Sequence, residues 1–156
     1  MTKKIILLLC VLVISYACKS DDDINQSEID QNIISKYLKD NNLEAIKTES
    51  GLHYIIHEKG EGKAPTKNSI IKFNSRVLGT NGIVYSDYLP EGQEVNVELD
   101  YLLLGLVEGY LLLKEGGSAT LIAPSHLAYK DSPPDTLTEL KNQVVIFEIK
   151  LIEVID

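Results

Sequence analysis

The sequence predicts an α+β fold in which a twisted antiparallel sheet wraps around one short helix and is preceded by an N-terminal helix. Three patterns support this prediction. Several segments alternate apolar and polar residues, as half-buried antiparallel strands do. One continuous apolar run, closed by two glycines, has the character of a buried helix. Near the N-terminus, apolar residues recur at helical spacing. A sheet covered by a helix buries the apolar faces of both.

The length and composition describe one domain with short appendages. The chain has 156 residues, of which 44% are hydrophobic and 24% are charged, and these values are typical of a globular protein. Its formal net charge is −8. Without Lys3 and Lys4 of a predicted leader, 13 basic side chains remain against 23 acidic ones, which gives −10. Because phosphate binding requires a basic surface, we expect no nucleic-acid partner.

Residues 1–17 are predicted to be a lipoprotein signal peptide. Two lysines precede an apolar run at residues 5–14, which is shorter than the roughly 20 residues that span a bilayer. Small residues then lie just before Cys18, and this pattern resembles the lipobox of bacterial lipoproteins. The resemblance implies that lipid on Cys18 anchors the chain to a membrane. The alternatives are an ordinary secretory signal or an unmodified Cys18. Lipidation is favoured because Cys10 is removed with the leader, so that Cys18 has no second cysteine with which to form an intramolecular disulfide.

Residues 18–26 are predicted to be an acidic tether. Three successive aspartates, residues 21–23, make this segment charged and self-repelling. The segment also resembles the surface-export signal of lipoproteins from the Bacteroidetes, in which acidic residues follow the lipidated cysteine. That resemblance implies an outer-membrane lipoprotein displayed at the cell surface. The alternative is a plain spacer with no address.

Residues 27–43 are predicted to form the N-terminal helix. Ser27 and Asp30 make a capping signature at its start, and the helix should end near Asn41-Asn42. We expect its apolar stripe to pack against the domain, and a homodimer through the same stripe is the alternative. The stripe consists of Ile29, Ile33, Ile34, Tyr37 and Leu38.

The remaining domain, residues 44–156, is predicted to be mostly strand. Apolar and polar residues alternate over residues 71–77, 95–99 and 147–151. The continuous apolar run extends from Leu102 to Lys114 between the second and third of these strands. Gly116 and Gly117 follow it and are expected to form the C-cap of a buried helix.

Several short motifs are spread over roughly two-thirds of the chain. They are Gly51-Leu52-His53-Tyr54, Gly60-Glu61-Gly62, Pro65, Gly105-Leu106-Val107-Glu108-Gly109, Pro124, Leu127-Ala128-Tyr129 and the strand from Val145 to Leu151. Together these motifs resemble those of the FKBP-type peptidyl-prolyl isomerases. The resemblance implies an FKBP-like fold, peptidyl-prolyl cis-trans isomerase activity that assists the folding of exported proteins, and proline-containing polypeptides as partners. It implies no cofactor.

The same resemblance implies an active site. Leu102 and Leu103 match a Val-Ile pair in which the backbone N–H of the second residue binds the prolyl-side carbonyl. Tyr129 matches a tyrosine whose hydroxyl caps the bound peptide, and Phe147 matches an aromatic wall. Leu106 stands at the position of a tryptophan floor. Tyr85 replaces the Phe that follows Asp-Gly in the family, and the corresponding pair here is Asn81-Gly82. The six implied site residues are thus Tyr85, Leu102, Leu103, Leu106, Tyr129 and Phe147.

Other positions depart from the family pattern. Ser75 replaces a pocket tyrosine, Ser86 an aspartate and Val95 a wall phenylalanine, and the chain contains no tryptophan. Of the Ile-Pro-Pro-Asn that precedes the last strand in the family, only Asn142 remains. Less aromatic surface lowers the affinity for an apolar substrate. These departures keep a second hypothesis open, a non-catalytic FKBP-like binding or scaffold lipoprotein with a degenerate pocket.

The implied reaction needs no metal, cofactor or nucleophile. Rotation about an X-Pro bond is slow because amide resonance imposes a barrier of about 18–20 kcal/mol. An apolar, water-poor site weakens that resonance, and a fixed donor orients the twisted state. His53, His57 and His126 lack the spacing of metal ligands, so we predict no metal site.

Overall fold

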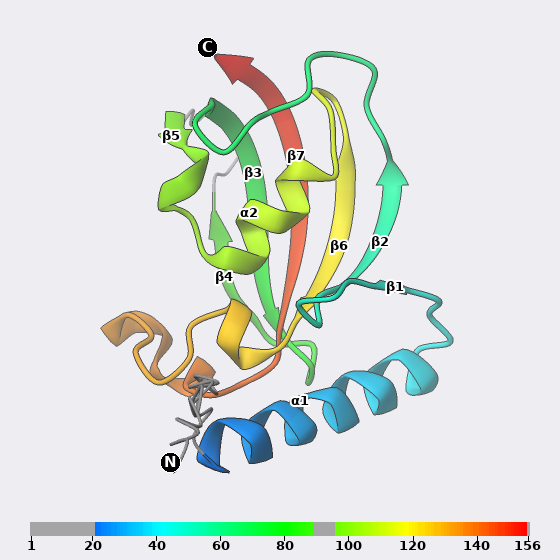
Figure 1. Ribbon diagram of the computed structural model, residues 1–156, viewed down its shortest axis with the longest axis vertical. Coiled ribbons are helices and arrows are strands. Elements are labelled where there is room, and N and C mark those ends of the chain that lie inside the picture. Colours follow the sequence, from blue (N-terminus) through cyan, green and yellow to red (C-terminus); the bar gives the residue numbers. More distant parts are fainter. Residues whose placement is uncertain (1–20, 89–95, 156) are drawn as a thin grey trace, which may run out of the picture.

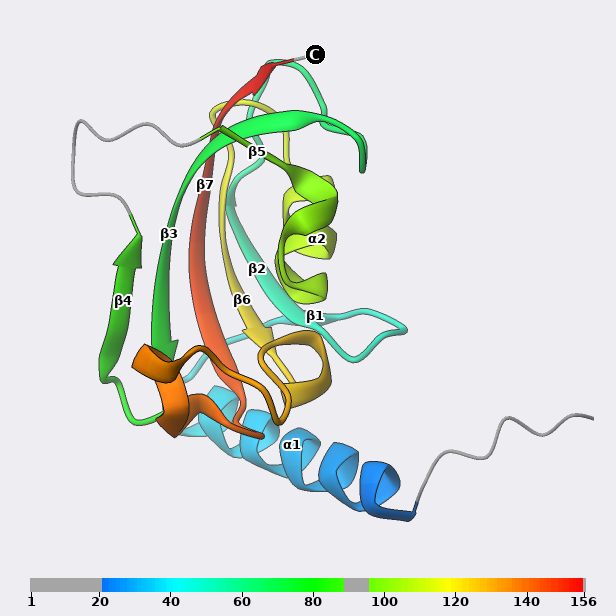
Figure 2. The same cartoon turned by 90° about the vertical axis from the view of Figure 1, so that its left-hand side faces the viewer.

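The computed structural model describes residues 21–88 and 96–155 (Figure 1). An antiparallel sheet curves around α2, and α1 lies across one end of the sheet (Figure 2). The predicted α+β architecture is therefore confirmed. In chain order the elements are α1 (Asp21–Asp40), β1 (Ile46–Lys47), β2 (His53–Glu58), β3 (Ile70–Gly79), β4 (Val84–Tyr88), β5 (Asn96–Glu98), the 3-10 helix η1 (Leu99–Tyr101), α2 (Leu104–Leu111), β6 (Ser118–Ala123), the 3-10 helices η2 (Ser125–Leu127) and η3 (Asp135–Leu140), and β7 (Val145–Ile155).

The sheet is built around β7. Within the described residues the strand order is β1-β2-β6-β7-β3-β4, with β5 also paired to β3, and every pairing is antiparallel. The alternation predicted over residues 147–151 is observed, because Phe147, Ile149 and Leu151 face the core while Glu148 and Lys150 do not. The core-facing side chains of β7 are Val145, Phe147, Ile149, Leu151 and Val154.

A glycine allows α2 to lie directly on the sheet. A Cβ atom at Gly109 would lie 2.2 Å from Cδ1 of Leu121 on β6, so any larger residue would push the helix away. Two other α2 residues, Leu106 and Tyr110, are buried against the inner face. The close approach therefore sets the height of α2, and of the residues just before it, above the sheet.

The N-terminal helix packs across one end of the sheet, next to η2 (Figure 2). Ile34 is fully buried in a second apolar cluster with Ile122, Val144 and Ile146. Three further stripe residues, Ile33, Tyr37 and Leu38, pack against this cluster, whereas Ile29 is 43% exposed. The stripe thus packs against the chain's own domain, as expected. Pairing with a second copy stays a prediction.

The bounds of α1 differ from the predicted 27–43. The helix begins at Asp21 and ends at Asp40, where Asn42 adopts a left-handed conformation with φ of 52°. Residues 21–26, predicted as part of a solvated tether, are thus helical. The physical reason is that residues 21–26 contain no proline or glycine that would stop the helix before Ser27. Only Lys19 and Ser20 separate Cys18 from α1.

Two other expectations need correction. Leu99, predicted in a strand, lies in η1, because the chain turns there toward α2. The buried helix ends at Leu111 rather than Lys114, since the N–H of Leu112 donates to the carbonyl of Gly109 and tightens the last turn. Gly116, with φ of 84°, therefore serves the turn into β6 and not the C-cap of α2.

The leader lies outside the described residues. Residues 1–17, Cys18 and Val95 all belong to segments that the structure does not describe. Among residues 21–88 and 96–155, neither helix combines the length and the apolar character needed to cross a bilayer.

The position of Ile34 predicts that α1 contributes to the stability of the whole domain. Ile34→Ala should lower the free energy of unfolding by about 2–4 kcal/mol, because it leaves a cavity between α1 and the sheet. Ile29→Ala in the same helix, at a 43% exposed position, should cost less than about 1 kcal/mol. Urea denaturation of the full chain measures both changes. Equal costs for the two substitutions would contradict this packing.

Candidate active site

The six predicted site residues come from five parts of the fold and belong to the main apolar core or pack against it. Leu106 of α2 and Phe147 of β7 are buried in the core, whereas the other four residues are half-buried and pack against it. Figure 1 shows the segment with η2 and η3, in yellow and orange, between α2 and α1. The half-buried members are Tyr85 of β4, Leu102 and Leu103 between η1 and α2, and Tyr129 after η2.

Tyr129 and Phe147 form an aromatic pair. Their ring centroids lie 6.4 Å apart and the ring planes are tilted by 51°, a geometry that favours the contact of ring edges and faces. Burial raises the pKa of the Tyr129 phenol above its ordinary value of 10.0. The hydroxyl is therefore protonated at neutral pH and able to donate a hydrogen bond.

Leu103 provides a second donor, from the backbone. It is the N-cap of α2, with φ of −56° and ψ of 144°, and its carbonyl accepts a hydrogen bond from the N–H of Val107. Its own N–H has no hydrogen-bond partner among the residues that the structure describes. Backbone amides at the start of a helix are available to external acceptors. The geometry thus allows an acceptor to bind next to the Leu103 side chain.

The turn before β4 places Tyr85. Gly82 has φ of 80°, which glycine adopts without strain, and Asn81 Oδ1 accepts a hydrogen bond from the N–H of Ile83 at 3.0 Å. Gly79 makes room for the tyrosine, since a Cβ atom there would lie 3.0 Å from Cε2 of Tyr85. The Asn81-Gly82 signature in the sequence therefore corresponds to a real turn that directs Tyr85 toward the cluster.

Tyr110 is a buried support that the sequence analysis missed. Its ring centroid lies 5.2 Å from that of Phe73, and its hydroxyl donates to the carbonyl of Asn74 at 3.2 Å. Burial raises the pKa of this phenol well above 10.0, so the hydroxyl stays neutral. Tyr110 sits three positions before the end of the apolar run, where helical spacing could have marked it as core-facing.

An exposed apolar rim flanks the predicted site. Tyr101 and Leu104 are 81% and 59% exposed, and they flank the half-buried Leu102 and Leu103 in sequence. The four residues 101–104 are all apolar and adjacent, so they cannot all face the core. From this run the sequence could have predicted that some of them are exposed. Exposed apolar side chains grouped beside a site are typical of binding surfaces.

The positions that depart from the family pattern have different surroundings. Ser75 is buried and faces the core from β3, opposite Ile149 of β7. Ser86 pairs with Val77 across the β3–β4 ladder. Asn142 has φ of 52° and donates its N–H to the carbonyl of Lys130 at 2.5 Å, so it closes the loop before β7.

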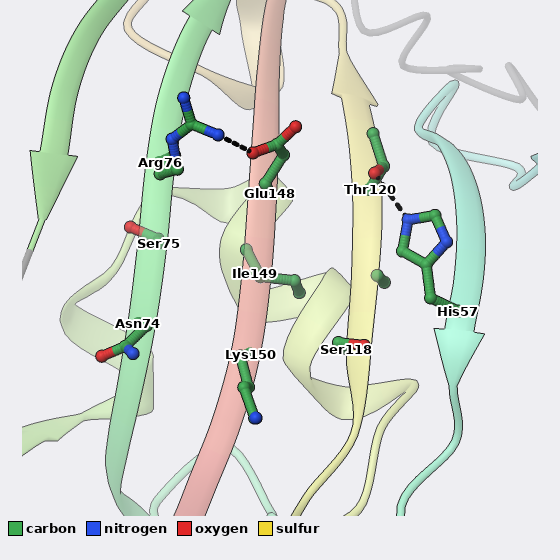
Figure 3. Close-up of a pocket in the computed structure, with 10 residues that line it drawn as sticks. His57, Asn74, Ser75, Arg76, Ser118, Thr120, Glu148, Ile149 and Lys150 are labelled. Carbon is green, nitrogen blue, oxygen red and sulfur yellow. Dashed lines mark hydrogen bonds and ion pairs between the residues drawn. The ribbon is translucent and has the colours of Figure 1, made fainter. Parts of the chain in front are cut away.

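A hollow of about 310 Å³ lies on the face of the sheet opposite α2 (Figure 3). Within it, Arg76 Nη1 lies 2.7 Å from Glu148 Oε2, and His57 Nε2 lies 2.8 Å from Thr120 Oγ1. None of the six predicted site residues lines it. We therefore assign the candidate site to the apolar cluster and not to this hollow.

The histidines have separate structural surroundings. Burial lowers the pKa of His53, whose Nδ1 lies 3.2 Å from the carbonyl of Gly51. His126 Nε2 lies 3.0 Å from the carbonyl of Ser50. In the part of the chain that the structure describes, no three His, Cys, Asp or Glu side chains are grouped so that they could hold a metal.

Comparison with known proteins gives one consistent family. The profile of the FKBP-type peptidyl-prolyl cis-trans isomerases matches residues 61–152. A probable FKBP-type peptidyl-prolyl cis-trans isomerase FkpA from Neisseria meningitidis serogroup B is 37% identical over 109 residues, which cover 69% of this chain and 39% of the relative. FkpA of Escherichia coli K12 is 28% identical over 110 residues, covering 70% of this chain and 40% of the relative. The chain thus spans less than half the length of these relatives.

Solved structures show the same fold. The crystal structure of FkpA from Escherichia coli superimposes with a TM-score of 0.70 at 23% identity and covers 85% of this chain and 61% of that one. A peptidyl-prolyl cis-trans isomerase from Pseudomonas syringae gives a TM-score of 0.69 at 16% identity, covering 89% of this chain and 100% of that one. The likeness extends over α1 as well as the sheet, since the covered share exceeds that of residues 44–156.

Proposed function

The chain belongs to the family of FKBP-type peptidyl-prolyl cis-trans isomerases, and from this premise we propose that it catalyses cis-trans isomerisation of X-Pro bonds in exported polypeptides. One observation supports the proposal most directly. The six side chains that match the family's site belong to the main apolar core of the domain or pack against it, and two donors accompany them, the Tyr129 hydroxyl and the Leu103 amide.

The proposed mechanism uses desolvation and orientation. Planar X-Pro amides are stabilised by a charge-separated resonance form that water solvates well. Proline held against the half-buried Leu103 and Tyr129, which pack on the core that contains Leu106 and Phe147, loses that solvation, so the twisted state becomes relatively more favourable. The Leu103 N–H binds the prolyl-side carbonyl, and the Tyr129 hydroxyl caps the peptide. No covalent bond forms or breaks, and the donors need only hold the substrate while the amide rotates.

We expect the activity to be modest. Leu106 and Ser75 occupy positions where the family has aromatic walls, and both are buried in this fold. Replacing aromatic surface by a smaller side chain removes tens of Å² of contact, at about 25 cal/mol per Å², and each 1.36 kcal/mol lost from the transition state lowers the rate tenfold. The same observation favours the alternative function, a non-catalytic binding or scaffold protein that keeps the fold.

We propose the outer membrane as the location, with lipid on Cys18 as the anchor. The proposal rests on the lipobox-like sequence before Cys18 and on the acidic residues after it. The start of α1 at Asp21 adds a consequence, since only two residues would separate the lipidated cysteine from the folded domain. The domain would then lie close to the membrane surface.

The Tyr129 hydroxyl yields a prediction about catalysis. Tyr129→Phe should lower kcat/KM about 2- to 10-fold, because one hydrogen bond of about 0.5–1.5 kcal/mol is lost. In the parent, burial holds the pKa of this phenol above 10.0, so its contribution should be constant between pH 6 and 9 and disappear only above about pH 10. NMR exchange spectroscopy of a proline peptide with the full chain measures the rate.

Tyr37→Phe is the matched control, because Tyr37 packs against the second cluster and not against the one that Tyr129 joins; its rate should equal that of the parent. Leu106→Trp tests the alternative function, because it restores the tryptophan that the family has at this position. If the parent is folded but exchange stays at the uncatalysed rate, and Leu106→Trp does not raise it, the binding or scaffold function replaces the enzyme.

The exposed rim yields a prediction about specificity. Leu104→Ser should raise KM about fivefold for peptides with Leu before the proline and much less for those with Ala, because about 1 kcal/mol of apolar contact is lost. Ile152→Ser, an exposed position on β7, is the control and should change neither KM. Equal effects of Leu104→Ser on both peptides would show that the exposed rim does not recognise the residue before the proline.

The anchor is tested in cells. Cys18→Ala should release the mature protein from the membrane fraction, because the multiple acyl chains of a lipoprotein are its only proposed attachment. Cys10→Ala, which changes the other cysteine of the chain, should leave the protein in that fraction. Immunoblotting of fractions after a high-salt wash measures the distribution. Retention of the Cys18→Ala variant would contradict lipid anchoring.

A further inference from the structure

A buried acidic residue connects α1 to the segment that carries Tyr129. Asp30 has no solvent exposure, and its Oδ2 accepts hydrogen bonds from the backbone N–H of Ser125 at 2.8 Å and from the Ser125 hydroxyl at 2.7 Å. Its Oδ1 accepts a third bond, from Gln26 Nε2 at 2.8 Å. A buried carboxylate is tolerated only when its oxygens are satisfied in this way.

Ser125 in turn fixes the backbone on both sides of Tyr129. Its carbonyl accepts hydrogen bonds from the N–H groups of Ala128 and Lys130, each at 3.0 Å. Lys130 has φ of 52°, a left-handed conformation that costs free energy for a residue with a side chain. Ser125 therefore uses its N–H and hydroxyl to bind Asp30, and its carbonyl to hold the turn at Tyr129.

A second connection runs from the same helix to the far side of this turn. The carbonyl of Lys130 accepts a hydrogen bond from the N–H of Asn142, and the carbonyl of Asn142 accepts one from Gln26 Nε2 at 3.2 Å. Gln26 and Asp30 are four residues apart and bond to each other, so they lie on one face of α1. That face thus holds the Tyr129 turn from both Ser125 and Asn142.

We propose that Asp30 is a positioning residue for the isomerase site, which holds Tyr129 in place through Ser125. This proposal rests on the proposed function. Asp30 does not touch the substrate; it fixes the backbone from which the Tyr129 ring reaches Phe147. The N-terminal helix then belongs to the catalytic unit, although the sequence analysis placed the FKBP-like domain at residues 44–156 and the helix before it.

A double-mutant cycle on the full chain tests this role. Asp30→Ala should lower kcat/KM about 2- to 10-fold, the range expected when one hydrogen-bond donor is misplaced. In the Tyr129→Ala background the same substitution should have no further effect, because the group it positions is already absent. Asp40→Ala is the matched control: Asp40 is exposed at the other end of α1, paired with Lys36, and its loss should leave kcat/KM unchanged.

Amide hydrogen exchange gives a readout that does not depend on activity. Asp30→Ala should accelerate exchange of the Ala128 and Lys130 N–H groups, whereas Asp40→Ala should not. If Asp30→Ala is unfolded at the assay temperature, Ser125→Ala replaces it in both experiments, because it removes the hydroxyl bond alone.

The outcomes separate this proposal from the proposed function. An active parent in which Asp30→Ala costs the same factor with and without Tyr129 contradicts the positioning role and leaves the isomerase function intact. Unchanged exchange at Ala128 and Lys130 also contradicts it. A folded parent without isomerase activity contradicts the proposed function and, with it, the catalytic role of Asp30.

Discussion

The burial of Phe147 is the contact on which the rest of this structure depends. It occupies the middle strand of the sheet, opposite Leu121 of β6 and Val77 of β3, and has no solvent exposure. Burying such a side chain stabilises a fold by about 1.5–3 kcal/mol, and here the same ring also contacts Tyr129. One side chain therefore belongs both to the core and to the candidate site. Phe147 thus connects β7, which curves around α2, with the turn that carries Tyr129.

The N-terminal helix illustrates how an amphipathic segment gains stability from the domain it covers. Most of the stability of a protein helix comes from tertiary packing of its apolar face, and α1 is held by Ile34 against the sheet and by Asp30 against Ser125. Apolar packing gives this contact its strength. The buried carboxylate gives it register, since Asp30 finds its partners in only one placement of the helix.

The chemistry assigned to the site explains why its side chains can vary while the fold persists. A reaction that requires only desolvation and one or two fixed donors can use the backbone N–H of Leu103, which any side chain at that position leaves in place. Leu106 is apolar and buried, although it has no aromatic ring. Fold and activity are thus separable in principle.

Local patterns determined much of this protein from the sequence alone. Alternation located β7, the Asn81-Gly82 pair marked the turn before Tyr85, and the continuous apolar run located α2, because each depends on neighbours within a few residues. The six candidate site residues came from family resemblance; in the structure two of them belong to the main core and four pack against it.

Tertiary structure alone decided the features that depend on distant residues. The pairing of Asp30 with Ser125 spans 95 residues, and no periodicity within either segment records it. The exposure of Tyr101 and Leu104 is likewise set by how η1 turns toward α2. Burial and hydrogen bonding between remote segments arise only when the sheet closes around α2, and for that reason the sequence could name candidate residues but not the contacts that hold them.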